Sequence, residues 1–205
     1  MDTIVDSCLG ERFGWIALDF VNTRVITRTG TADALRCPSH LLKWMERAEP
    51  PGWMTLKPAD ISARRTLHLE ALRLRVALDQ LFVGHTTAAG HLPKMATEHA
   101  LGRPISWTLT SGRLEGAEDG TLYIAKEYTS LHPAAALGPI AQNAVELLQS
   151  VDRARLRRCG ADLCLRWFVD TSKGGRRGWC SMATCGNRAK AARYRARRER
   201  DADDT

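Results

Sequence analysis

Apolar residues recur at helical spacing through a long stretch of the chain, residues 58–83. Asp60 or Ser62 is placed to cap the start of this stretch, and Gly84 is a natural stop. The pattern predicts one long helix in which arginines alternate with the apolar positions. Those apolar positions are Ile61, Leu69, Leu72, Val76 and Leu81.

The same spacing predicts shorter helices on both sides of this stretch. Pro38 separates the first two of them. A further apolar run, residues 15–23, fits either a buried strand or a buried helix, and periodicity alone does not separate the two. The predicted short helices cover 31–36, 39–48, 93–101 and 139–151. The expected buried face of the second one consists of Leu41, Leu42, Trp44 and Met45.

Between residues 104 and 126 the pattern changes to an alternation of apolar and polar side chains. Three alternating segments, separated by Gly, Ser and Asp-Gly, cover 104–110, 112–116 and 121–126. This arrangement is typical of a short antiparallel meander. The pattern as a whole therefore predicts an α+β fold with a mixed helical body.

Charge divides the 205-residue chain into two parts. The net charge is +7, yet residues 1–150 carry 15 basic and 16 acidic residues. Residues 153–200 carry the other 15 basic residues and only three acidic ones. We therefore predict a near-neutral domain over 1–150 and a small basic module over 151–205.

Composition narrows the class of protein. With 44% apolar residues and a mean hydropathy of −0.29, the chain is expected to be a soluble globular protein. It contains no apolar run of about 18 residues, which a membrane span requires. Its first residues include acids and no apolar segment typical of a secretory signal. We expect a cytoplasmic location, where cysteines stay reduced.

Four of the six cysteines form two equally spaced pairs. Cys159 and Cys164 are separated by four residues, as are Cys180 and Cys185, and 15 residues lie between the pairs. Two such loops can turn four thiolates towards one ion, and Zn²⁺ favours tetrahedral thiolate coordination. The alternatives are disulfides, which a reducing compartment disfavours, or free structural thiols. The spacing predicts one structural zinc ion rather than a catalytic one, because no position remains for water.

The segment around these cysteines has too few apolar residues to form a core of its own. A module of about 45 residues seldom folds without a staple, and structural zinc contributes roughly 10–16 kcal/mol in comparable small sites. We expect Trp167 and Trp179 to belong to its small core rather than to stack on bases, and Cys8 and Cys37 to be buried thiols. The spacer between the pairs predicts a β-hairpin that rises over 165–171, turns at 173–175 and returns over 176–179. The last cysteine would then precede a helix over 187–198.

These residues resemble the CGNR zinc finger, whose name-giving tetrapeptide stands here at 185–188. The similarity extends to Phe-Val-Asp-Thr-Ser at 168–172 and to Trp-Cys-Ser-Met-Ala-Thr at 179–184. The body is similar to the ABATE domain through Leu-Asp-Phe-Val-Asn-Thr at 18–23. The resemblance implies a stress-induced transcription regulator of the kind found in bacteria, with the four cysteines as zinc ligands.

Basic residues fill the predicted C-terminal helix. Lys190, Arg193, Arg197 and Arg200 follow a 3-4-3 spacing and so form one stripe. Like charges on one helix face repel each other, and a phosphate backbone would relieve that repulsion. Arginine forks also suit phosphate and guanine edges. With two arginines at the expected hairpin tip, the candidate nucleic-acid contacts are Arg176, Arg177, Arg188, Lys190, Arg193, Arg195, Arg197 and Arg198.

The favoured function is a transcription regulator that binds double-stranded DNA. The open alternatives are an RNA-binding zinc module, a zinc-stapled protein-interaction module and a solvated basic tail. The body has no nucleophile elbow, phosphate-binding glycine loop or HExxH motif, so we expect no enzyme but a sensor or dimerisation domain. Asp19, Asn22 and Thr23 are candidates to line a pocket for a small-molecule effector. A homodimer is open, and no membrane partner is expected.

Overall fold

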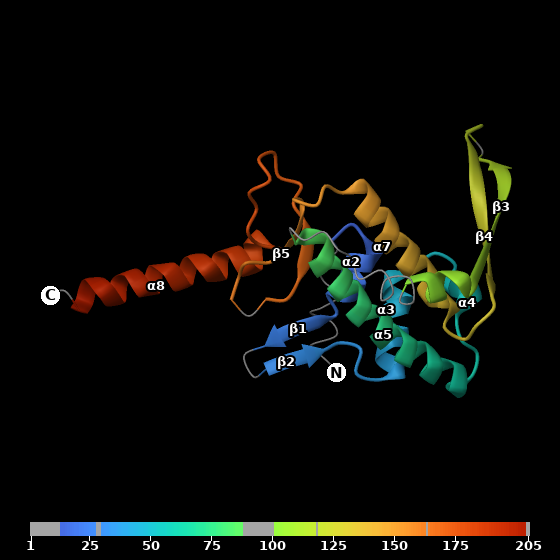
Figure 1. Cartoon of the computed structure of the whole chain (residues 1–205), viewed down its shortest axis with the longest axis horizontal. Helices are drawn as coiled ribbons and strands as arrows, with labels where there is room; N and C mark the ends of the chain where they lie inside the picture. The colour runs from blue at the N-terminus through green and yellow to red at the C-terminus, as the bar shows by residue number, and fades with distance from the viewer. Residues whose placement is uncertain (1–12, 28–29, 88–100, 118, 163, 204–205) are drawn as a thin grey trace.

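Helices form the body of the protein, a hairpin extends from one end of it, and a small module with a long helix extends from the other (Figure 1). The computed structural model describes residues 13–27, 30–87, 101–117, 119–162 and 164–203. The α-helices of the body with described bounds are α2 (Ile16–Val21), α3 (Pro38–Ala48), α4 (Trp53–Leu56), α5 (Ile61–Thr86) and α7 (Gly138–Ser150), and a 3₁₀ turn, η1 (Ala135–Leu137), precedes the last. Residues 101–106 are also helical. None of the described helices has the length and apolar character needed to cross a membrane.

The apolar run at 15–23 forms a helix, α2, that is buried in the centre of the body. Ala17, Leu18, Phe20 and Val21 are all buried. Only Ile16 and Asp19 of the six residues are partly exposed, so the helix has almost no polar face and its sequence shows no clear helical period. It packs against α5 and α7, so it joins the two longest helices of the body.

The long helix α5 confirms the predicted cap, because the Asp60 carboxylate accepts a hydrogen bond from the backbone N–H of Ala63 at 2.8 Å. The helix continues past Gly84 to Thr86. Its predicted apolar face is wrong in part. Three of those residues are exposed, at 69% for Ile61, 57% for Leu69 and 45% for Val76. The apolar side chains that are buried are Leu67, Ala71, Leu74, Leu78, Leu81 and Phe82.

Two stripes of α5 thus have helical spacing, and the neighbouring elements select one of them. The helix contacts α2, α3 and α7, and the stripe that faces them becomes the core. The shorter predicted face on α3 is close to the structure: Leu41, Trp44 and Met45 are buried, and Leu42 is half-buried against the same core. The predicted helix over 93–101 lies mostly outside the described residues.

Three antiparallel hairpins complete the described part of the fold. The helix expected over 31–36 is wrong, because Ala32 pairs with Val25 in the first hairpin and the strand continues to Asp33. Residues 104–106 are helical, and the segments expected at 104–110 and 112–116 contribute to a single strand. The α+β class is confirmed. The paired strands are β1 (Arg24–Thr27) with β2 (Gly30–Asp33), β3 (Thr108–Gly116) with β4 (Leu122–Ser130), and β5 (Leu156–Arg158) with β6 (Trp167–Val169).

The hairpin of the basic module pairs differently from the prediction. Strand β6 pairs with β5, which precedes the first cysteine, and not with 176–179. Residues 176–179 form no strand, because their backbone is used elsewhere: the Gly178 carbonyl accepts from the Gly160 N–H at 2.8 Å. The loop that follows Cys159 is thus hydrogen-bonded to the segment that precedes Cys180.

The module is packed onto the body rather than tethered to it. Leu156 and Trp167 belong to the same buried cluster as the body helices. The Asn22 side chain makes two hydrogen bonds of 2.8 Å, to the N–H and to the carbonyl of Trp167. The Trp167 indole N–H donates to Asp79 at 2.7 Å, and its ring meets Phe82 edge-on at 5.7 Å. The predicted boundary at residue 150 falls at the end of α7.

Candidate metal centre and basic helix

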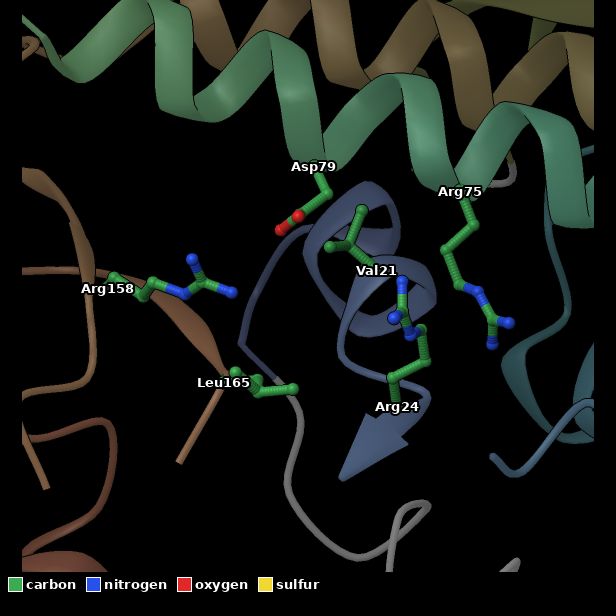
Figure 2. Close-up of a pocket in the computed structure, with 6 residues that line it drawn as sticks. All are labelled: Val21, Arg24, Arg75, Asp79, Arg158 and Leu165. Carbon is green, nitrogen blue, oxygen red and sulfur yellow. The ribbon is translucent and has the colours of Figure 1, made fainter. Parts of the chain in front are cut away.

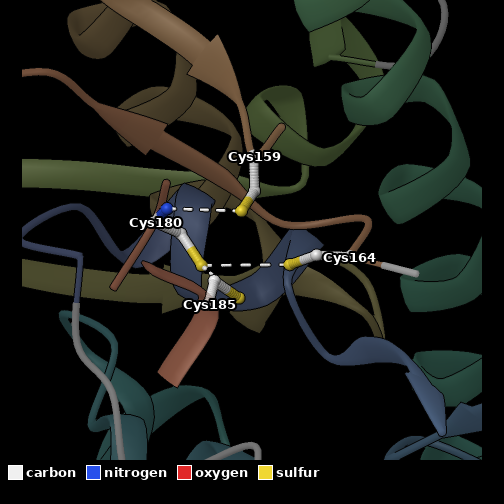
Figure 3. A group of neighbouring side chains, drawn as sticks. All are labelled: Cys159, Cys164, Cys180 and Cys185. Atoms are coloured by element: carbon white, nitrogen blue, oxygen red, sulfur yellow. Dashed lines mark hydrogen bonds between the residues drawn. The ribbon is translucent and has the colours of Figure 1, made fainter. Parts of the chain in front are cut away.

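Four sulfur atoms converge between the β5–β6 hairpin and the start of the last helix (Figure 3). The Sγ atoms of Cys159, Cys164, Cys180 and Cys185 all lie within 4.8 Å of one another. The Sγ of Cys180 is 3.9 Å from that of Cys164 and 3.7 Å from that of Cys185. A tetrahedron with Zn–S bonds of about 2.3 Å has S–S edges of about 3.8 Å. The cluster therefore fits one zinc ion, as the sequence predicts.

Backbone hydrogen bonds hold the cysteine loops in place. The N–H of Cys159 donates to the Arg166 carbonyl at 2.8 Å, and the N–H of Cys180 donates to the Cys159 sulfur at 3.4 Å. Cys185 lies in a short π-helical turn, η2 (Met182–Gly186), which leads directly into α8 (Asn187–Asp203). A Cβ at Gly186 would collide with the flexible side chain of Met182, which is 46% exposed and would have to move.

The close approach of the sulfur atoms shifts the pKa values of Cys164, Cys180 and Cys185 in different directions. A hydrogen bond with Cys180 lowers the pKa of Cys164 to about 5. That same hydrogen bond, together with burial, raises the pKa of Cys180 above its ordinary value. Burial, followed by the charge of Cys164 and Cys159, raises the pKa of Cys185 to about 11. Since zinc binds thiolates, a metal ion would displace the protons that this crowding retains.

The buried carboxylate of Asp170 organises the turn of the module. It is 1% exposed and accepts from the Ser172 hydroxyl and N–H and from the Arg177 N–H. The Ser172 hydroxyl, followed by these backbone N–H groups, lowers the pKa of Asp170 to about 2. Sequence reasoning did not select Asp170, although it lies within the segment 168–172 that carried the family resemblance.

Arg177, a candidate nucleic-acid contact, is placed inside this network. Its guanidinium donates to the carbonyls of Trp179 and Cys180 and lies over the Phe168 ring at 5.2 Å. It thereby holds the segment that leads into the second cysteine pair. Its neighbour Arg176 is exposed.

The remaining candidate contacts lie on α8, which projects away from the module and the body (Figure 1). Arg188 donates to the Cys185 sulfur at 3.8 Å, and Arg193 lies over the Trp179 ring at 5.6 Å. Both therefore also contact the module. The side chains of Arg197 and Arg200 lie outside the described part of the chain. The other three candidates on the helix are exposed: Lys190, Arg195 and Arg198.

The three candidate pocket residues take part in packing and hydrogen bonding. Asn22 and Thr23 are 4% and 1% exposed. Asn22 holds Trp167, as described above, and the Thr23 hydroxyl donates to the Phe20 carbonyl at 2.7 Å. The Asp19 carboxylate accepts from the Phe13 N–H at 2.8 Å. None of the three lines the pocket that lies next to them.

The two isolated cysteines differ in what the structure describes. Cys37 is half-buried where α3 begins, and its sulfur lies 3.1 Å from the Ser39 hydroxyl. This hydrogen bond lowers the pKa of the Cys37 thiol. Cys8 lies outside the described residues, so its expected burial stays a prediction.

The fold and the cysteine geometry together define a zinc-finger protein with an α+β N-terminal domain. Residues 155–198 match the family model of the CGNR zinc finger. Residues 14–151 match the model of the ABATE domain, described as "Putative stress-induced transcription regulator". The chain therefore belongs to the ABATE family and carries a CGNR zinc finger at its C-terminal side. No curated protein matches it.

Proposed function

We propose that this protein is a transcription regulator whose zinc finger presents α8 to double-stranded DNA. One observation carries the proposal: α8 leaves the module just after Cys185 and points away from the body, and those of its basic side chains that the structure describes are exposed (Figure 1). A helix whose only role was packing would bury an apolar face. Here Tyr194, the one aromatic residue of α8, is 64% exposed.

Charge and dimensions favour a nucleic acid as the partner. A helix of 17 residues is about 26 Å long, and the major groove of B-DNA admits an α-helix. Mutual repulsion of the basic side chains falls when phosphates replace their counterions. The family description adds that ABATE proteins are associated with transcription regulation, which favours DNA over the RNA alternative.

In this proposal the finger fixes the helix and the body supports the finger. When bound, zinc would supply four metal–sulfur bonds that close the loops around Cys159 and Cys185. Arg188 and Arg193 then align the start of α8 through their contacts with Cys185 and Trp179. We assign the body a non-enzymatic role as sensor or assembly domain, and the cytoplasmic location expected from the sequence forms part of the proposal.

The test removes exposed charge from α8 without disturbing its base. The triple variant Lys190→Ala, Arg195→Ala and Arg198→Ala changes residues whose side chains make no described hydrogen bond. The matched control removes three exposed positive charges from the body by Lys43→Ala, Arg65→Ala and Lys126→Ala. Duplexes selected from genomic fragments are titrated at several salt concentrations, and zinc content and circular dichroism verify folding.

We expect the α8 variant to bind selected duplex at least about tenfold more weakly and to reduce the slope of log K against log salt by up to about 3. The control variant keeps wild-type affinity and slope. Equal losses in the two variants would reject α8 as the reader. Enrichment of RNA instead of duplex DNA would reject the DNA assignment and favour the RNA-binding alternative.

A further inference from the structure

A small pocket lies where the body meets the finger, and three of its six lining residues are arginines. The empty space in and above it is about 330 Å³ with open solvent included, so its enclosed part is smaller. In Figure 2, Arg158 reaches from the finger towards Asp79, and Arg24 rises beside Val21. The residues that line the pocket are Val21, Arg24, Arg75, Asp79, Arg158 and Leu165.

One of the three arginines is built into the body. Arg75 is 4% exposed and makes two hydrogen bonds to the Asp33 carboxylate and one to the Thr23 hydroxyl. Burial opposes ionisation of Asp33, but the hydrogen bonds from Arg75 and Leu35 and the charge of Arg75 outweigh it and lower its pKa. The Nε of Arg75 is buried without a hydrogen-bond partner among the described residues. This donor is costly to leave unpaired.

Neither of the other two arginines forms an ion pair within the described ranges, although the charge of Arg24 also helps to lower the pKa of Asp33, its cross-strand neighbour. Arg158 lies over the Trp167 ring at 5.7 Å, and within the described ranges neither it nor Arg24 makes a side-chain hydrogen bond. The Asp79 carboxylate accepts the Trp167 indole N–H. With Asp33 counted against Arg75, three guanidinium groups face two carboxylates, and the pocket region keeps an excess positive charge.

We propose that this pocket binds a phosphate group, either as free phosphate or as the monoester of a small molecule. Guanidinium forks bind oxyanions through paired, charge-assisted hydrogen bonds. Here the two forks without a described hydrogen bond, those of Arg24 and Arg158, come from separate elements, β1 and β5, so together they can hold several oxygens of a tetrahedral dianion. Because this space includes open solvent, its enclosed part suits only a group as compact as phosphate, and the remainder of an ester would extend into solvent.

Such a ligand would join the two regions of the protein. Arg24 and Arg75 belong to the body, whereas Arg158 ends β5, and Leu165 directly follows the zinc-ligand candidate Cys164. A phosphate group held between them stabilises the docked finger, and linkage requires that docking in turn strengthens its binding. This ligand site does not depend on the proposed DNA binding.

The test uses the full-length, zinc-loaded protein labelled with ¹⁵N, and inorganic phosphate as the probe. The Trp167 indole N–H reports on the pocket, and the Trp44 indole in the body core serves as internal reference. Titrations compare phosphate, glycerol 3-phosphate and acetate with sodium chloride at equal ionic strength. The variants are Arg24→Gln and Arg158→Gln, and Arg65→Gln removes one exposed positive charge from α5 as the control.

We expect phosphate or its ester to shift the Trp167 signal saturably, while the Trp44 signal stays in place. Arg24→Gln and Arg158→Gln each weaken the apparent affinity about tenfold or more, and Arg65→Gln leaves it unchanged. Tighter binding of the ester would identify the ligand as a phosphomonoester, and tighter binding of the free ion would identify it as phosphate. A linear response, a response equal to that of sodium chloride, or saturation by acetate alone overturns the proposal. The proposal is also overturned if only duplex DNA moves the Trp167 signal and Arg24→Gln weakens duplex binding.

Discussion

The body and the finger of this protein are stabilised in different ways. The body buries large side chains from its helices in one cluster, and Phe20, Trp44 and Phe82 are among its most buried members. The finger's own buried cluster consists of Ala161, Phe168 and three cysteines. Burial of apolar surface is sufficient for the first region, whereas the second depends on sulfur chemistry and on polar contacts.

Contacts with the body also stabilise the finger. Leu156 and Trp167 complete the body's core, and Asn22 holds the backbone of Trp167 from the body side. The position of α8 relative to the body therefore depends on two separate supports, the cysteine cluster and the docked β-hairpin. Each support can be removed by itself.

Loss of zinc should produce the largest difference in stability between the finger and the body. Cys180→Ser removes the sulfur nearest to two others, and structural zinc contributes roughly 10–16 kcal/mol in small sites. We expect the wild type to hold about one zinc per chain and the variant to lose it. Amide hydrogen exchange should then become fast over 159–186, while α5 stays protected.

A matched variant in the core of the body should destabilise the body and leave the finger intact. Leu78→Ala opens a cavity in the body core and should cost about 2–5 kcal/mol there, with zinc content unchanged. If Cys180→Ser left the finger protected from exchange, or removed protection from α5 as well, the two regions would not have separate sources of stability.

The hydrogen bonds between Asn22 and Trp167, which link the body to the finger, should have the next largest effect on stability. Asn22→Ala leaves the buried N–H and carbonyl of Trp167 without partners, at a cost of about 1–3 kcal/mol for each group. Thermal unfolding should change from one transition to two, with the finger melting first. Asn187→Ala is the control, because its exposed side chain bonds only the Ala183 carbonyl, and a single transition should remain. Two identical melting curves would show that Asn22 does not couple the regions.

Of the three perturbations, acid should have the smallest effect on stability, and it should act on the body and on the finger at different pH values. The pKa of Asp33 is lowered in the folded body, so its contribution is present above the unfolded value of about 3.9 and is lost as pH falls through the folded value. Asp33→Asn leaves the buried charge of Arg75 without a counterion. Because Asp33 is one-third exposed, we expect a cost of about 2 kcal/mol, below that of a fully buried pair.

Urea unfolding of the body at pH 7, 5 and 3 measures this difference. The gap between wild type and Asp33→Asn should be constant from pH 7 to 5 and should shrink towards pH 3. Zinc content, followed in parallel, should fall at a higher pH, because thiolates take up protons before this carboxylate does. A gap that widens in acid would contradict the assigned sign.

The local signals in the sequence predicted several features correctly. The Asp60 cap needs only its own helix, and the C-x₄-C spacing brings each cysteine pair together within one loop. Predictions that depended on a distant partner were less accurate. Residues 30–33 became a strand because 24–27 pairs with them, and β6 chose β5 over the later segment 176–179.

The sequence by itself determined the division of charge, the four-cysteine cluster and the basic C-terminal helix, because each depends on residue type and short spacing. Only the tertiary structure decided which stripe of α5 is buried, that Asn22 supports Trp167, and that Arg177 stays inside the finger while Arg24 and Arg158 meet in one pocket. These outcomes depend on contacts between residues as many as 145 positions apart, which no local pattern specifies.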